Sequence, residues 1–209
     1  MIIISHRGYW KEAAEKNRPV AFHRSFDLGY GTETDVRDLR RTLMIAHDPP
    51  DGSEITLADM LAILGSRDLP LAMNIKADGL ARDLAAAMQA HGVKRWFTFD
   101  MTVPETVVQL RLGLPVFTRA SEYEQPPPCY DQAIGVWLDA FVSTWYTLAY
   151  IETFLRDGKQ VAIVSPELHG RDHKDLWGAL NASSIKAHPN LMLCTDIPEA
   201  ATALFGDGS

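Results

Sequence analysis

Short apolar runs alternate with helical patterns along the whole chain, and this alternation most constrains the fold. Eight runs predict strands, at residues 2–5, 31–36, 71–76, 96–99, 116–119, 134–138, 161–165 and 191–194. Strands that alternate with helices pair in parallel. Eight units in 209 residues average about 26 residues each, near the lower size limit of a (β/α)₈ barrel. We therefore predict an α/β fold, a compact TIM barrel forming one domain over residues 1–209; a doubly wound sheet is the alternative.

The helices are predicted between these strands. One begins after Thr56, a plausible N-cap, and another begins near Pro198. The remaining patterns cover residues 18–28, 79–91, 104–112 and 147–157. A further short extended piece, at residues 43–46, ends at His47.

Composition limits the partners and the location. The formal net charge is −7, from 20 Lys and Arg against 27 Asp and Glu, so a nucleic-acid partner is not expected. No stretch approaches the roughly 18 apolar residues of a membrane span. Residues 1–4 are too short, and lack the basic start, for a signal peptide. Cytoplasmic location is the default expectation, and nothing in the sequence indicates an oligomeric state.

Polar residues gather where the first predicted strands end, which is where barrel enzymes place their active sites. His6 directly follows the first strand. In "GTETDVR", Glu33 and Asp35 share one strand face, because side chains alternate. Two adjacent carboxylates repel unless a cation lies between them, and Mg²⁺ or Ca²⁺ would suit oxygen ligands. The alternative for such a pair is a solvated strand edge.

The next strand ends add a second histidine and two cations. His47 ends its own apolar run, and two imidazoles can act as general acid and general base near neutral pH. Asn74 and Lys76 share a face of "LAMNIK", and Lys76 and Arg7 could hold an anion. Together these groups indicate cleavage of a phosphodiester, a small-molecule substrate.

The motifs resemble those of the glycerophosphodiester phosphodiesterase family, within the barrels similar to phosphatidylinositol-specific phospholipase C. They are "SHRG", "EKNRPVAF", "GYGTETDVR", "IAHD" and "LCTDIPEAA". The motifs in residues 5–48 are specific in combination, and a weaker similarity covers most of the chain. The family usually carries a sizeable insertion after His-Asp, whereas this chain has only "PPDGSE". The resemblance implies a hydrolase of lipid-derived phosphodiesters.

The resemblance also implies roles for individual residues. His6 and His47 would be the acid–base pair, and Arg7 and Lys76 would contact phosphate. Glu33 and Asp35 would bind the metal. The family usually has Glu where this chain has Asn74, which would be an uncharged third ligand. We expect either a loosely bound metal or a shell completed by a carboxylate that follows a later strand, Asp139 or Glu167.

The short barrel also resembles proteins grouped with surface-polysaccharide biosynthesis, through "NIKADGL", "FTRASEYE" and "IVSPELHGR". Polar residues in or near these later motifs are candidates for the pocket, and the alternative for each is a solvated loop residue: Arg119, Glu122, Asp139, Glu167 and His169.

Three functions fit these residues. The leading one is metal-dependent hydrolysis of a glycerol- or sugar-linked phosphodiester. The second keeps the same site but forms a cyclic phosphate by attack of a substrate hydroxyl, as a lyase does. The third is a catalytically weak barrel that binds a phosphorylated glycan.

Overall fold

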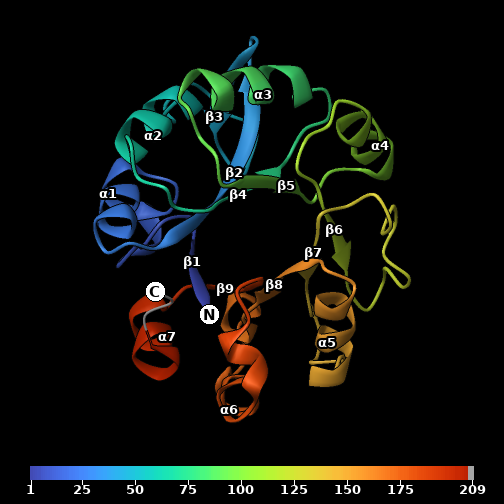
Figure 1. The fold of residues 1–209 in the computed structure, drawn as a ribbon. Coiled ribbons are helices and arrows are strands. Elements are labelled where there is room, and N and C mark those ends of the chain that lie inside the picture. The colour runs from blue at the N-terminus through green and yellow to red at the C-terminus, as the bar shows by residue number, and fades with distance from the viewer. Residues whose placement is uncertain (207–209) are drawn as a thin grey trace. The chain divides into compact units, whose positions relative to one another are not determined.

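The computed structural model describes residues 1–206, which form two compact units. The N-terminal unit contains residues 5–116, and the C-terminal unit contains residues 1–4 and the chain from residue 117 onward. Strand β1 (Ile2–His6) contributes to both units. The strand order is β5-β4-β2-β1-β9-β8-β7-β6, with β3 paired to β2 off this path (Figure 1).

Three strands of the N-terminal unit run parallel, and a fourth forms a hairpin. The parallel strands are β2 (Gly31–Leu39), β4 (Leu71–Ile75) and β5 (Trp96–Phe99). Strand β3 (Thr42–Ile45) runs antiparallel to β2, with Leu39 opposite Thr42. The two residues between them, Arg40 and Arg41, have φ values of 50° and 71°. Positive φ at both central residues is typical of the type I′ turn that joins tightly paired strands.

The helices of this unit begin where local signals predict. Pro19 and Pro104 lie in the first turns of α1 (Pro19–Asp27) and α4 (Val103–Arg111), where their missing N–H has no partner to lose. Thr56 caps α2 (Leu57–Leu64) through a reciprocal capping box with Asp59. The unit also contains α3 (Ala81–Ala90) and a 3₁₀ turn, η1 (Ala13–Glu15). Helices α1, α2 and α3 lie on one side of the strands (Figure 1).

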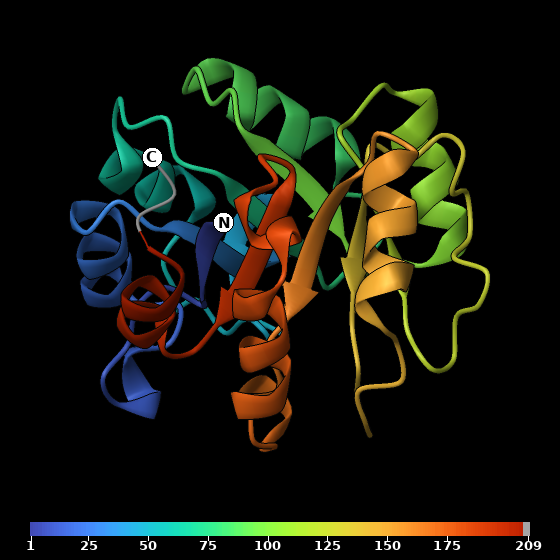
Figure 2. The ribbon, with the colours of Figure 1, turned by 60° about the horizontal axis from the view of Figure 1, so that its bottom comes forward.

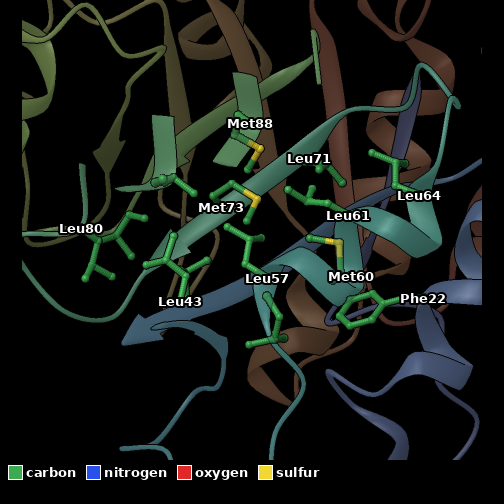
Figure 3. Close-up of a cluster of buried hydrophobic side chains, with 14 of the residues drawn as sticks. Phe22, Leu43, Leu57, Met60, Leu61, Leu64, Leu71, Met73, Leu80 and Met88 are labelled. Carbon is green, nitrogen blue, oxygen red and sulfur yellow. The ribbon is translucent and has the colours of Figure 1, made fainter. Parts of the chain in front are cut away.

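The apolar core of the N-terminal unit lies between these helices and the strands. Figure 3 shows Met73 of β4 among leucine and methionine side chains of α2, with Phe22 of α1 at the edge. Leu71, Met73 and Ile75 all point into this cluster because they alternate along β4. Burial of each large side chain contributes about 1.5–3 kcal/mol. One face of β4 is therefore committed to the core, and Asn74 is left on the other.

The C-terminal unit repeats the alternation of strand and helix. Its parallel strands are β6 (Phe117–Ala120), β7 (Gly135–Leu138), β8 (Gln160–Val164) and β9 (Leu191–Thr195). Its helices are α5 (Leu148–Arg156), α6 (Lys174–Ala182) and α7 (Pro198–Phe205), with 3₁₀ turns η2 (Pro166–His169) and η3 (Ser184–Ala187). Figures 1 and 2 both show α6 beside α7, where the Trp177 and Phe205 rings lie 5.6 Å apart.

One glycine of this unit is required by packing. Gly135 begins β7 opposite Phe117, and a Cβ added there would lie 2.5 Å from the Phe117 ring. Only glycine fits such a close approach of backbone to side chain.

All eight predicted barrel strands are present, with ends shifted by at most three residues. The largest shift is in β2, which runs to Leu39 because it pairs with β3. Helix α6 was not predicted from the sequence, because Gly178 and Asn181 weaken its helical pattern. Within residues 1–206 no helix has the length and apolar character needed to cross a membrane.

Candidate functional site

Two carboxylates lie on the face of β2 that is turned away from the apolar core. Glu33 and Asp35 are 1% and 0% exposed. Asp35 is in register with Asn74 on β4, and Asn74 Nδ2 donates a hydrogen bond to Glu33 Oε1 at 3.2 Å. The structure therefore brings together the three residues that the sequence suggests as metal ligands.

Two cations compensate Asp35. Arg7 Nε lies 2.9 Å from Asp35 Oδ2, and Lys76 Nζ lies 3.5 Å from Asp35 Oδ1. Neither contact has hydrogen-bond geometry, since Arg7 Nε and Asp35 Oδ1 both lack a hydrogen-bond partner. These are ion pairs held by proximity. Lys76 Nζ also lies 3.5 Å from Asp100 Oδ2, so it sits between two carboxylates.

The turn after β1 positions Arg7. Arg7 and Gly8 have φ values of 59° and 78°, in the left-handed region. A Cβ at Gly8 would lie 2.8 Å from the Cβ of Ala21, so the approach of α1 requires glycine there. The Arg7 backbone N–H donates to the Glu33 carbonyl at 2.9 Å and contacts Glu33 Oε2 at 3.2 Å. One residue therefore contacts Glu33 with its backbone and Asp35 with its side chain.

Two residues of this cluster, Asn17 and Asp100, were not predicted from the sequence. Asn17 Nδ2 donates to Asp35 Oδ2 at 2.9 Å, and its Oδ1 accepts from the Thr34 hydroxyl at 2.8 Å. Asn17 lies in the "EKNRPVAF" motif, and its place in that motif could have indicated that it belongs to the site. Asp100 directly follows β5, and this position at the end of a strand could have indicated that it belongs to the site.

His6 lies beside Glu33 and is largely buried. Its Nε2 is 3.9 Å from Glu33 Oε2, and its side chain is 15% exposed. Burial, followed by repulsion from Asp35, raises the pKa of Glu33 to about 7, although His6, Arg7 and Lys76 oppose this shift. The charged form of Glu33 is therefore disfavoured on this face, and a bound cation would stabilise it.

His47 occupies the end of the β2–β3 hairpin. The N–H of Ala46 donates to the carbonyl of Asp35 at 3.0 Å, so the chain just before His47 lies beside the buried carboxylate strand. The His47 side chain is 49% exposed, and its Nδ1 lies 2.9 Å from Asp48 Oδ1. A carboxylate on Nδ1 fixes the orientation of an imidazole and leaves Nε2 available.

A divalent cation fits the donors on this face. Two buried oxygens, Asp35 Oδ1 and Asn74 Oδ1, have no hydrogen-bond partner, and Glu33 lies beside Asn74. Across residues 1–206 there is no group of three or more His, Cys, Asp or Glu side chains arranged to hold a metal ion. Any metal at this face would therefore need the amide oxygen of Asn74 as a third ligand, an acceptable donor for a hard cation.

The remaining candidates lie in the C-terminal unit, where Asp139 and His169 form a pair. His169 Nε2 lies 2.7 Å from Asp139 Oδ1, which also accepts from the N–H of Ala140 at 2.8 Å. The indole N–H of Trp145 donates to the Asp139 carbonyl at 2.8 Å. Asp139 directly follows β7, and His169 ends the 3₁₀ turn after β8.

The other three candidates are held by neighbours in the same unit. Glu122 accepts from three consecutive backbone N–H groups, at residues 141–143. Arg119 forms a two-point ion pair with Glu124, with Nη2 3.1 Å from Oε1. Glu167 accepts from the hydroxyls of Ser165 and Thr195. Both Glu167 oxygens are thus engaged locally, as expected of a structural residue.

Comparison with known proteins defines the fold. No protein-family model and no curated protein matches the sequence. Solved structures do match. A glycerophosphodiester phosphodiesterase from Agrobacterium tumefaciens has a TM-score of 0.74 at 16% identity, over 98% of each chain. An Oleispira antarctica phosphodiesterase, in complex with the product sn-glycerol-3-phosphate, has a TM-score of 0.69 at 12% identity, over 98% of this chain and 96% of its own.

A third match is a glycerophosphoryl diester phosphodiesterase from Parabacteroides distasonis, with a TM-score of 0.67 at 12% identity, over 97% of this chain and 85% of its own. At these identities the likeness establishes the fold. The predicted (β/α)₈ barrel class is confirmed, and the resemblance to glycerophosphodiester phosphodiesterases holds at the level of the fold.

Proposed function

We propose that this chain is a phosphoric diester hydrolase that cleaves a glycerol- or sugar-linked phosphodiester. The observation that carries the proposal is the fully buried pair Glu33 and Asp35 within β2, set against Arg7 and Lys76. Buried charges are costly and gather at functional sites. The fold shared with three phosphodiesterases supports this reaction class.

Arg7 and Lys76 are proposed to bind the phosphate. The guanidinium of Arg7 presents a planar set of donors that suits phosphate oxygens, and Lys76 adds a point charge. Asp35 holds both cations on the same face before substrate arrives, which reduces the cost of ordering them.

His6 and His47 are proposed as the acid–base pair. One imidazole accepts a proton from the attacking water as a new P–O bond forms. The other donates a proton to the leaving alkoxide as the old P–O bond breaks. The Asp48 carboxylate on Nδ1 of His47 prepares Nε2 of that ring for this task.

Glu33, Asp35 and Asn74 are proposed to hold a divalent cation, Mg²⁺ or Ca²⁺. When bound, such an ion would polarise a phosphoryl oxygen and stabilise the charge that develops on it. The support is the pair of buried, unpartnered oxygens on Asp35 and Asn74. Two carboxylates and one amide give fewer charges than three carboxylates, so we expect weak binding of the metal.

Turnover with and without added metal tests the proposal. The full chain is incubated with a chromogenic phosphodiester and with glycerophosphodiesters, in Mg²⁺, Mn²⁺, Ca²⁺ or a chelator. We expect metal-dependent release of an alcohol and an open phosphate monoester in phosphorus NMR spectra. A cyclic phosphate product would instead establish the lyase reaction. Binding of phosphodiesters without turnover under any metal would contradict hydrolysis and support the binding protein.

A further inference from the structure

We propose that the C-terminal unit carries its own binding site for the adjacent hydroxyl groups of an uncharged polyol. The site consists of Asp139, Tyr146, His169 and Arg171. All four residues lie in one compact unit.

Unsatisfied buried polar atoms mark the site. Within residues 1–206, five buried side-chain nitrogen or oxygen atoms lack a hydrogen-bond partner. Three belong to the cluster around β2, and the other two are Tyr146 Oη and Arg171 Nε. Leaving such an atom unpaired destabilises the folded protein, so each requires an explanation. A ligand that bonds to both atoms would supply one.

These two side chains converge on one loop, residues 139–146. Arg171 donates to the carbonyl of Ala140, and His169 lies 2.7 Å from the Asp139 carboxylate. Tyr146 is 7% exposed. Burial and the nearby Asp139 carboxylate raise the pKa of Tyr146 well above its usual value, so its hydroxyl stays protonated and can both donate and accept.

The charge balance favours a neutral ligand over an anion. Arg171 donates to the backbone carbonyl of Ala140, the residue after Asp139, and both Arg171 and the carboxylates of Asp139 and Glu122 act on Tyr146. Two carboxylates outweigh one guanidinium, so the loop has no excess positive charge to attract phosphate. Donors (Arg171 Nε–H and Tyr146 O–H) stand beside an acceptor carboxylate. Hydroxyl groups match such a mixture because each one donates and accepts.

Aromatic rings extend beside these polar groups. The Phe141 ring lies 5.2 Å from the His169 ring and 6.1 Å from the Tyr123 ring. Tyr123 is 74% exposed, a large aromatic surface left to solvent. Flat apolar rings beside a few convergent polar groups are typical of small-molecule sites. They would cover the C–H face of a polyol while the polar cluster binds its hydroxyls.

NMR titration of the full chain tests the site. Three probes are added separately: glycerol, a methyl hexoside and inorganic phosphate. The indole N–H of Trp145, bonded to the carbonyl of Asp139, reports on the loop and is assigned with Trp145→Phe. We expect a saturable shift with at least one polyol. Saturation by glycerol points to a small triol, and saturation by the hexoside alone points to a sugar ring. Absence of any polyol response, or a response to phosphate alone, overturns the proposal.

Tyr146→Phe separates ligand binding from folding. It removes only the unpartnered hydroxyl, so we expect polyol affinity to fall about 3- to 10-fold with no loss of thermal stability. The matched control is Tyr130→Phe, which removes a hydroxyl that donates to Asp157 at 2.7 Å elsewhere in the unit. The control should leave polyol affinity unchanged. If Tyr146→Phe binds the polyol as tightly as the parent chain, the site is wrong.

Discussion

Burial disfavours the charge of both Glu33 and Glu122, yet the pKa values of these two glutamates shift in opposite directions. Glu33 lies within β2, where burial and Asp35 raise its pKa to about 7. Glu122 lies just after β6. Burial also opposes its charge, but the backbone N–H groups of residues 141–143 lower its pKa below the usual value. A strand cannot offer its own N–H groups, because the sheet uses them, whereas a loop can.

The comparison extends to the two polar clusters. Charge on the β2 face is compensated by side chains from other segments, such as Arg7 and Lys76. Charge in the C-terminal cluster is compensated mainly by nearby backbone and by the Asp139–His169 pair. The first arrangement therefore depends on charged side chains from distant segments, whereas the second relies mostly on neutral backbone groups.

The largest expected effect is the loss of phosphodiester turnover when either proposed catalytic histidine is replaced. His6→Ala and His47→Ala should each lower phosphodiester turnover about 10²–10⁴-fold, because a positioned acid or base contributes that much. Circular dichroism should show both variants folded. His91→Ala is the control, since His91 is exposed and its Nδ1 lies 3.0 Å from the Ala87 carbonyl near the end of α3. If both variants turn over the phosphodiester at the parental rate, the proposed acid–base mechanism is wrong.

Removal of Asp35 tests whether a buried ion pair contributes more to the free energy of unfolding than a partly exposed one. Asp35→Ala leaves Arg7 and Lys76 without their counter-ion and should cost about 3–5 kcal/mol in the free energy of unfolding. Glu124→Ala breaks the partly exposed pair with Arg119 and should cost less than about 1 kcal/mol. Urea unfolding measures both. Equal losses would show that burial on the strand face has no special consequence.

Asn74→Glu should add the charge that the β2 face lacks. A third carboxylate beside Glu33 should tighten binding of Mg²⁺ or Ca²⁺ about tenfold, measured by calorimetric titration. The metal-free variant should be less stable, because three buried carboxylates repel one another. Asn74→Gln is the control, because it lengthens the side chain without adding charge. Unchanged metal affinity in Asn74→Glu would mean that Asn74 does not contact the ion.

The smallest effect should come from Glu15, which supports the segment before Asn17. Hydrogen bonds from Arg24 and the backbone of Lys11 lower the pKa of Glu15 from 4.5 to about 2. Its folded-state pKa is depressed, so its contribution to stability is present above pH 4.5 and disappears as the pH falls to about 2. Glu15→Gln should therefore melt slightly lower than the parent chain at pH 6 and equally at pH 2. A difference that persists at pH 2 would assign the effect to packing.

The strand-borne part of the site was predictable from the sequence, whereas several loop-borne residues were not. Alternation along β2 and β4 placed Glu33, Asp35 and Asn74 on one face because a strand has a fixed period of two. Asn17 reaches Asp35 from a residue with φ of 58°, a conformation that no periodic pattern indicates. Tyr146 and Arg171 were missed because both lie in loops, which have no period.

The β2–β3 pairing was missed for a related reason. Its tip is Arg40-Arg41, which carries neither the glycine nor the asparagine that usually indicates a type I′ turn.

The same tip ties the position of His47 to the apolar core. His47 lies just after the returning strand of a hairpin, and its position along β2 is set by the length of a two-residue turn. One residue added to the pairing would turn the imidazole to the opposite face, but it would also turn Leu43 and Ile45 of β3 out of the core. Glu33 and Asp35, on β2, would keep their places. The packing of two apolar side chains thus maintains the register on which the proposed role of His47 depends, so a change in turn length would lower stability before it could act on turnover.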